Sequence, residues 1–208
     1  MYINGDAMDR ADEYLIEIRN MDRFSLIKLW EEHAEKDFDE SFWKKGKVLE
    51  YVVLRAFELE KEDCVTYPYD VYAGKNEGYN RPIEQIDGAV HVDELYALVE
   101  CKDYTGNKIN IEPLAKMRNQ LARRHSAVFG MFFSATQYTS PAEILVGYMA
   151  PQLIILWTKE DIECCLRNSC FIQCMKTKYR KAVENCEYNY AFYMEYNEFE
   201  KLESTPLF

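Results

Sequence analysis

The sequence predicts a mixed α/β (α+β) fold in which a small mixed β-sheet is flanked by helices, with helical additions at the N- and C-termini. Apolar residues recur at helical spacing over residues 48–62, whereas residues 83–92 and 95–102 alternate with the period of a strand. Two short apolar runs, at 128–133 and 153–157, are typical of fully buried strands. Together these patterns favour a sheet with both parallel and antiparallel pairs.

The N-terminal half is predicted to begin with helices and to continue into strands. Large apolar side chains in residues 8–36 have the spacing of two short amphipathic helices, and residues 48–62 form a longer one. Residues 64–73 are rich in aromatic and β-branched side chains, which favours a strand. The alternating residues 83–92 and 95–102 then form a β-hairpin.

The C-terminal half is predicted to alternate helices and strands. Residues 111–125 form a helix whose Pro113 lies in the first turn, where a missing N–H is tolerated. A short helix over 141–149 separates the two buried strands, and Thr158 is a candidate N-cap for a helix that runs toward Cys165. The many aromatic residues of 184–203 indicate that this segment packs onto the domain.

The length of 208 residues is enough for one domain with terminal extensions. We expect an acidic helical extension over 1–43, a core over 44–165, and a helical, aromatic-rich extension over 166–208 packed on the core. No apolar run is long enough to span a bilayer, so a membrane is not an expected partner. The start lacks a signal-peptide pattern and the cysteines number seven, which favours free thiols in the cytoplasm.

The net charge of −11 argues at first against a nucleic acid as partner. The distribution of charge changes this interpretation, because residues 1–43 carry 12 acidic and 5 basic side chains. The remainder is much closer to neutral, so a local basic groove is compatible with the sequence. Weak non-specific binding is the expectation.

The hairpin has a predicted register in which paired residue numbers sum to 187. One face is then apolar throughout, and the other carries a polar cluster at the open end of the hairpin. That cluster contains Gln85, Asp87, Glu100 and Lys102. Asp87 lies opposite Glu100, and like charges so placed destabilise a hairpin unless a cation lies between them. Mg²⁺ (or Mn²⁺) prefers such oxygen ligands.

Two carboxylates and a lysine around a divalent cation suit phosphodiester hydrolysis. The metal polarises the phosphate and lowers the pKa of the attacking water, and Lys102 orients that water or stabilises the developing charge. The alternative is an ordinary solvated strand face on which Lys102 only offsets the charge of Glu100. The apolar opposite face and the unfavourable carboxylate pairing favour the metal site.

The sequences Ile86-Asp87-Gly88 and Val99-Glu100-Cys101-Lys102 resemble the active-site signature of the PD-(D/E)xK nuclease superfamily, and most closely that of the Mrr-like restriction endonuclease catalytic domain. The resemblance covers roughly residues 44–165 and implies a restriction-endonuclease-like core. It implies that Asp87, Glu100 and the backbone carbonyl of Cys101 bind the metal, and that Lys102 is the catalytic lysine. Glu50 matches a helix glutamate that reaches the metal through water, with an ordinary solvated residue as the alternative.

One face of the predicted helix 111–125 carries a polar, mostly basic stripe of helical spacing. Gln120 resembles the glutamine often found on this helix in the family, and the stripe is suited to follow a DNA phosphate backbone. A solvated helix face is the alternative. The stripe consists of Lys116, Gln120, Arg123 and Arg124.

These observations predict a metal-dependent DNA endonuclease acting on double-stranded DNA, in restriction or defence, that leaves a 5′-phosphate as the family implies. One alternative is a nuclease-like DNA-binding or interaction module with little catalysis, which the acidic surface favours. Another is a nuclease of DNA repair or junction resolution. Paired cuts in a duplex would favour a homodimer, which the sequence leaves open.

Overall fold

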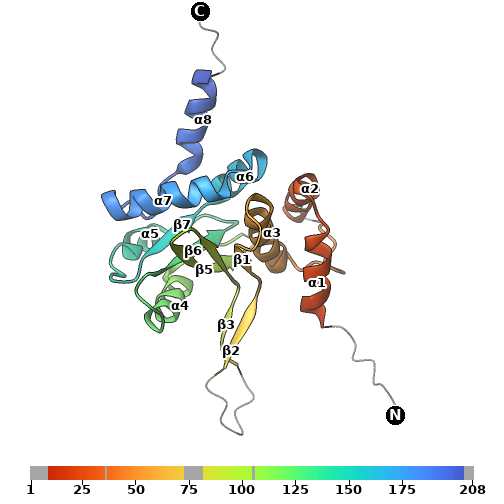
Figure 1. Cartoon of the computed structure of the whole chain (residues 1–208), viewed down its shortest axis with the longest axis horizontal. Coiled ribbons are helices and arrows are strands. Elements are labelled where there is room, and N and C mark those ends of the chain that lie inside the picture. Colours follow the sequence, from red (N-terminus) through yellow and green to blue (C-terminus); the bar gives the residue numbers. More distant parts are fainter. Residues whose placement is uncertain (1–8, 36, 73–81, 105, 204–208) are drawn as a thin grey trace, which may run out of the picture.

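A computed structural model describes residues 9–35, 37–72, 82–104 and 106–203 of the chain (Figure 1). Its main feature is a five-stranded sheet of order β1-β4-β5-β6-β7, beside a two-stranded sheet formed by β2 and β3. β1, β4 and β5 pair antiparallel, whereas β5, β6 and β7 pair parallel, as expected for a mixed sheet. The strands are β1 Val65–Thr66, β2 Tyr69–Tyr72, β3 Pro82–Ile86, β4 Gly88–Val92, β5 Leu95–Lys102, β6 Val128–Ser134 and β7 Ile154–Trp157.

Helices precede, separate and follow the strands in the predicted order. They are α1 Arg10–Arg19, α2 Arg23–His33, α3 Lys45–Glu60, α4 Ile111–Ala122, α5 Ser140–Val146, α6 Lys159–Asn168, α7 Phe171–Asn185 and α8 Phe192–Glu203. The prediction that Thr158 caps a helix is confirmed, since its side chain accepts from the N–H of Asp161 in a capping box. The predicted domain boundary at residue 165 falls inside α6, and the division into domains stays a prediction.

Two hydrophobic cores lie on the two faces of the large sheet. The alternation along β5 separates them: Ala97 and Val99 face the core shared with α1, α2, α3, α6 and α7, whereas Leu98 faces the core shared with α4 and α5. Figure 1 shows α7 and α4 on opposite sides of the strands. Glu100 follows Leu98 by two residues, so it points toward the α4 side.

The predicted hairpin register is confirmed over its closed end. Gly88 pairs with Val99 and Val92 with Leu95, and the residue numbers in each pair sum to 187, as predicted. The open end differs, because the predicted strand 83–92 breaks at Asp87 into β3 and β4. β3 leaves the large sheet and pairs with β2, where Gln85 lies opposite Asp70.

This break overturns two expectations about side chains. An unbroken alternation over 83–92 would place Ile86 on the face of Val90, but Ile86 packs in the core on the α4 side, because the strand breaks at Asp87. Gln85 is exposed on β3 and is not part of the polar cluster. The predicted strand 64–73 is likewise split, since Pro68 lies between β1 and β2 and has no N–H to donate to a ladder. Residue 73 lies outside the described residues.

The terminal helices cover the sheet face opposite α4. α1 and α2 pack against α3, and α7 packs against α3 and β7. Lys178 of α7 is completely buried and its Nζ lies 2.7 Å from Asp161 Oδ2 of α6. In the part of the chain that the structure describes, no helix is long and apolar enough to cross a bilayer.

Candidate active site

The residues predicted to carry the chemistry come together at the end of β5. Asp87 occupies the break between β3 and β4, and Glu100, Cys101 and Lys102 end β5. Glu50 reaches the same region from α3. A close approach of α3 to β4 makes this possible, since a Cβ at Gly88 would lie 2.7 Å from Leu54 Cδ2 of α3.

Asp87 is buried and bound to β5 by its side chain rather than by strand pairing. Its Oδ2 accepts a hydrogen bond of 3.0 Å from the N–H of Cys101. The same oxygen lies 3.6 Å from Nζ of Lys102. The carboxylate is therefore held beside the end of β5 in a fixed orientation.

Glu100 is only 1% exposed and its two oxygens have different surroundings. Oε1 lies 2.8 Å from Nζ of Lys102 and 3.1 Å from Nζ of Lys116. Oε2 is buried and has no hydrogen-bond partner. A buried carboxylate oxygen without a partner is unfavourable, so this atom indicates a site for a ligand that donates or is positively charged.

The ammonium of Lys102 contacts the same three groups that are predicted to bind a metal. Besides the two carboxylates, it donates to the carbonyl oxygen of Cys101 at 2.9 Å. Burial lowers the pKa of Lys102, but Asp87 and Glu100 outweigh it and raise this pKa above its ordinary value. Lys102 thus remains a cation and neutralises the carboxylates in the ligand-free protein.

Glu50 is buried on α3 and forms an ion pair with Lys47. Nζ of Lys47 lies 2.6 Å from its Oε2. Burial, followed by the charge of Asp87, raises the pKa of Glu50 to about 7, although Lys47 acts in the opposite direction. The local charge of the site therefore changes near neutral pH.

The stripe predicted on a helix over 111–125 divides into two parts, because α4 ends at Ala122 and both arginines follow it. Lys116 lies in the site, and the buried Gln120 donates from Nε2 to the carbonyl of Gln85 at 3.2 Å, which ties α4 to β3. Arg123 and Arg124 both pair with Glu84 of β3. Burial would raise the pKa of Glu84, but the two arginines lower it below its ordinary value. Their contact with DNA stays a prediction.

The oxygen donors of this site suit a hard divalent cation, although the donors do not yet surround an open position. Among the described residues, no three His, Cys, Asp or Glu side chains form a group that could hold a metal ion as they stand. The predicted site uses two carboxylates and one carbonyl, and Lys102 lies against all three. Oε2 of Glu100 is buried and has no hydrogen-bond partner, so it is available to a further ligand. The residues therefore fit a metal that takes the place of an ammonium group beside these oxygens.

Sequence reasoning missed a buried pair beside Lys102. Nε2 of His33 on α2 lies 3.6 Å from Oδ2 of Asp103, and Nδ1 lies 2.5 Å from the carbonyl oxygen of Trp30. These residues border a cavity of about 160 Å³ at the ends of β5 and β6. Nothing in the sequence signals this contact, because it joins residues 70 positions apart, 33 and 103, through tertiary packing alone.

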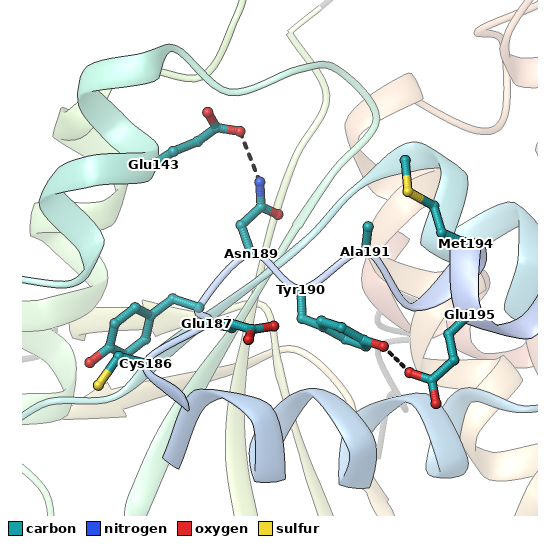
Figure 2. Close-up of a pocket in the computed structure, with 9 residues that line it drawn as sticks. Glu143, Cys186, Glu187, Asn189, Tyr190, Ala191, Met194 and Glu195 are labelled. Carbon is teal, nitrogen blue, oxygen red and sulfur yellow. Dashed lines mark hydrogen bonds between the residues drawn. The ribbon is translucent and has the colours of Figure 1, made fainter. Parts of the chain in front are cut away.

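A larger cavity, of about 620 Å³, lies away from the predicted residues, between α5, residues 186–191 and α8 (Figure 2). Asn189 donates from Nδ2 to Oε1 of Glu143 at 2.8 Å, and the hydroxyl of Tyr190 donates to Glu195. Its carboxylates make this cavity unsuited to a polyanion such as DNA.

No family model matches the chain, and no curated protein matches it. Among solved structures, the small subunit of the heterodimeric restriction endonuclease R.BspD6I is similar, with a TM-score of 0.50 and 13% identity over 86% of this chain and 98% of that one. This likeness shows a restriction-endonuclease-like fold.

Two further restriction endonucleases are similar at lower scores. The DNA modification-dependent enzyme AspBHI gives a TM-score of 0.43 and 14% identity, over 81% of this chain and 40% of that one. MspJI in complex with a 27-mer oligonucleotide gives a TM-score of 0.40 and 13% identity, over 89% of this chain and 40% of that one. Both enzymes are thus much longer than the part that this chain matches.

Proposed function

We propose that this chain is a metal-dependent DNA endonuclease of the PD-(D/E)xK superfamily, similar to the Mrr-like restriction endonucleases, and that it uses Mg²⁺ (or Mn²⁺). The observation that carries the proposal is the buried, partnerless Oε2 of Glu100, on a carboxylate that contacts the same Lys102 ammonium as Asp87 and the carbonyl of Cys101. An unsatisfied anionic oxygen in a cluster of oxygen donors is what a divalent cation would complete. The restriction-endonuclease-like fold adds support.

Each group of the site would have its own role in hydrolysis. Asp87, Glu100 and the Cys101 carbonyl would hold the cation, and Glu50 would reach it through a water molecule. When bound, the cation polarises the scissile phosphate and lowers the pKa of the attacking water. Lys102 stays protonated beside the two carboxylates, so it can orient that water or stabilise charge on the phosphate.

Double-stranded DNA is the proposed substrate, and restriction of foreign or modified DNA in the cytoplasm is the proposed role. The similar small subunit belongs to a restriction endonuclease that is named as heterodimeric. Cutting both strands of a duplex calls for two active sites, which a homodimer would provide. Light scattering of the protein on a duplex measures which assembly forms.

Calorimetric titration of Mg²⁺ and Mn²⁺ into the wild type and Asp87→Asn tests the metal site. Asp93→Asn is a matched control, because it removes one carboxylate at the opposite, closed end of the same hairpin, where Asp93 pairs with Lys61 and Lys176. We expect binding to be lost in Asp87→Asn and kept in Asp93→Asn. Equal binding by all three proteins would contradict the site.

A catalytically weak DNA-binding module is a second candidate, and one observation favours it. The ammonium groups of Lys102 and Lys116 already neutralise Glu100 without any metal. Incubation with methylated and unmethylated plasmids separates the two functions. Duplex binding in EDTA with no cleavage in Mg²⁺ or Mn²⁺ would favour the module, whereas metal-dependent cleavage that Lys102→Ala abolishes would favour the nuclease.

A further inference from the structure

We propose that Lys116 regulates the site by competing with the divalent cation for Glu100, an inference that rests on the metal-dependent function proposed above. In the ligand-free protein Lys116 holds Glu100 through its ammonium group. When the cation binds, the ammonium must leave. Lys116 thereby sets the concentration of cation at which the site fills.

The contact joins two elements that are distant in sequence. Lys116 projects from α4, and its Nζ lies 3.1 Å from Oε1 of Glu100 on β5. Lys102 contacts the same oxygen at 2.8 Å, so two ammonium groups share one atom while Oε2 has none. This arrangement balances the carboxylate charge only from one side, and it leaves the other side for an entering cation.

Lys116 is better suited than Lys102 to leave as the cation enters. Its side chain is 55% exposed, against 23% for Lys102, so its ammonium can return to water. Water can hydrate the released ammonium, and the entering dication then supplies the positive charge that the buried Glu100 needs. An ammonium kept beside Oε1 would instead repel a dication that binds Oε2 of the same carboxylate.

The release needs only the side chain of Lys116 to move, because the helix itself is fixed. Gln120, one turn further along α4, donates to the carbonyl of Gln85. Met117 packs so close to β6 that a Cβ at Gly130 would lie 2.7 Å from its Cε. Since these contacts hold the backbone of α4 in place, the ammonium of Lys116 can leave Glu100 by rotation of its side chain alone.

Titration of MnCl₂ into the metal-free protein, followed by calorimetry, tests the inference without any DNA or turnover. The variants are Lys116→Met, Lys116→Arg and, as the matched control, Lys28→Met, which breaks an exposed ion pair with Glu32 on α2. We expect Lys116→Met to lower the Kd for Mn²⁺ roughly three- to tenfold. Lys116→Arg and Lys28→Met should stay within about twofold of the wild type.

The outcomes separate this inference from the proposed function. If the wild type binds Mn²⁺ and Asp87→Asn does not, but Lys116→Met binds as the wild type does, the competition is wrong and the metal site stands. If the wild type and all variants bind no Mn²⁺, both are wrong. Circular dichroism checks that each variant is folded, and Lys116→Gln, which also removes the charge, should reproduce the effect of Lys116→Met.

Discussion

The N–H of Cys101 donates to Oδ2 of Asp87 at 3.0 Å, and this bond joins the break between β3 and β4 to the strand that carries Glu100 and Lys102. At this point β3 turns away to pair with β2, so no ladder fixes Asp87. The side-chain bond replaces the ladder. It places a carboxylate beside the end of β5 while both carboxylates stay within reach of Lys102.

Lys102→Ala should abolish DNA cleavage while the fold is kept. Removing the ammonium takes away charge stabilisation at the phosphate, and losses of about 10²–10³-fold or more are typical for such groups. Lys116 still neutralises Glu100 in this variant, so the structure should tolerate it. Single-turnover cleavage rates and thermal melting measure the two effects.

Lys159→Ala is the control for this variant, because it removes a lysine whose ion pair with Glu163 lies on the surface of α6. Cleavage by Lys102→Ala at the wild-type rate would contradict the assignment of the catalytic lysine.

In EDTA, the stability of the protein should fall as the pH rises from about 4.5 to about 7, because Glu50 keeps its proton in the folded state to about pH 7. The unfolded state loses that proton near pH 4.5, its ordinary value. The contribution of Glu50 is therefore complete below the unfolded pKa and is lost as the pH passes the folded pKa.

Glu50→Gln mimics the protonated side chain, so it should flatten this part of the pH dependence and be more stable than the wild type at pH 8. Urea unfolding at several pH values measures both proteins. If the free energy of unfolding of Glu50→Gln depends on pH as steeply as that of the wild type, another group causes the pH dependence. Saturating Mg²⁺ should also reduce this loss of stability at higher pH, since a cation favours the ionised carboxylate.

Lys178→Met should destabilise the fold by about 3–5 kcal/mol, because it leaves the fully buried Asp161 without its cationic partner. Lys178 also donates to the carbonyl of Leu156 at 2.9 Å, so the variant loses a bond between α7 and β7. Urea unfolding at pH 7 measures the change.

Lys176→Met, on the same helix, breaks an exposed pair with Asp93 and should change stability little. Equal effects of the two variants would mean that burial does not distinguish these ion pairs.

Glu84→Gln should strengthen non-specific duplex binding, because it removes the carboxylate that holds Arg123 and Arg124. Each arginine that then contacts a phosphate steepens the plot of log affinity against log salt by about 0.9. Fluorescence anisotropy with a labelled duplex at several salt concentrations measures this slope.

The matched control is Glu163→Gln, which also removes one negative charge and releases two cations, Lys159 and Arg167, on α6. If both variants gain affinity equally, the effect comes from net charge and not from Arg123 and Arg124.

The sequence by itself determined the elements whose signals are local. The alternation of residues 88–92 and 95–99 predicts their pairing correctly, because one shifted residue would turn every apolar side chain to the wrong face. The helix after Thr158 was predictable because a cap acts within one turn. The order of helices and strands follows from the same short-range periodicities.

Only the tertiary structure decided how these elements meet. The departure of β3 at Asp87 depends on its pairing with β2, and the contacts of Lys116 with Glu100 and of Glu84 with Arg124 depend on where α4 packs. Periodicity tells which face of a helix or strand is apolar, but it does not tell which polar residue of another element lies opposite. That choice depends on packing between segments distant in the chain, and it places two lysines on one buried carboxylate.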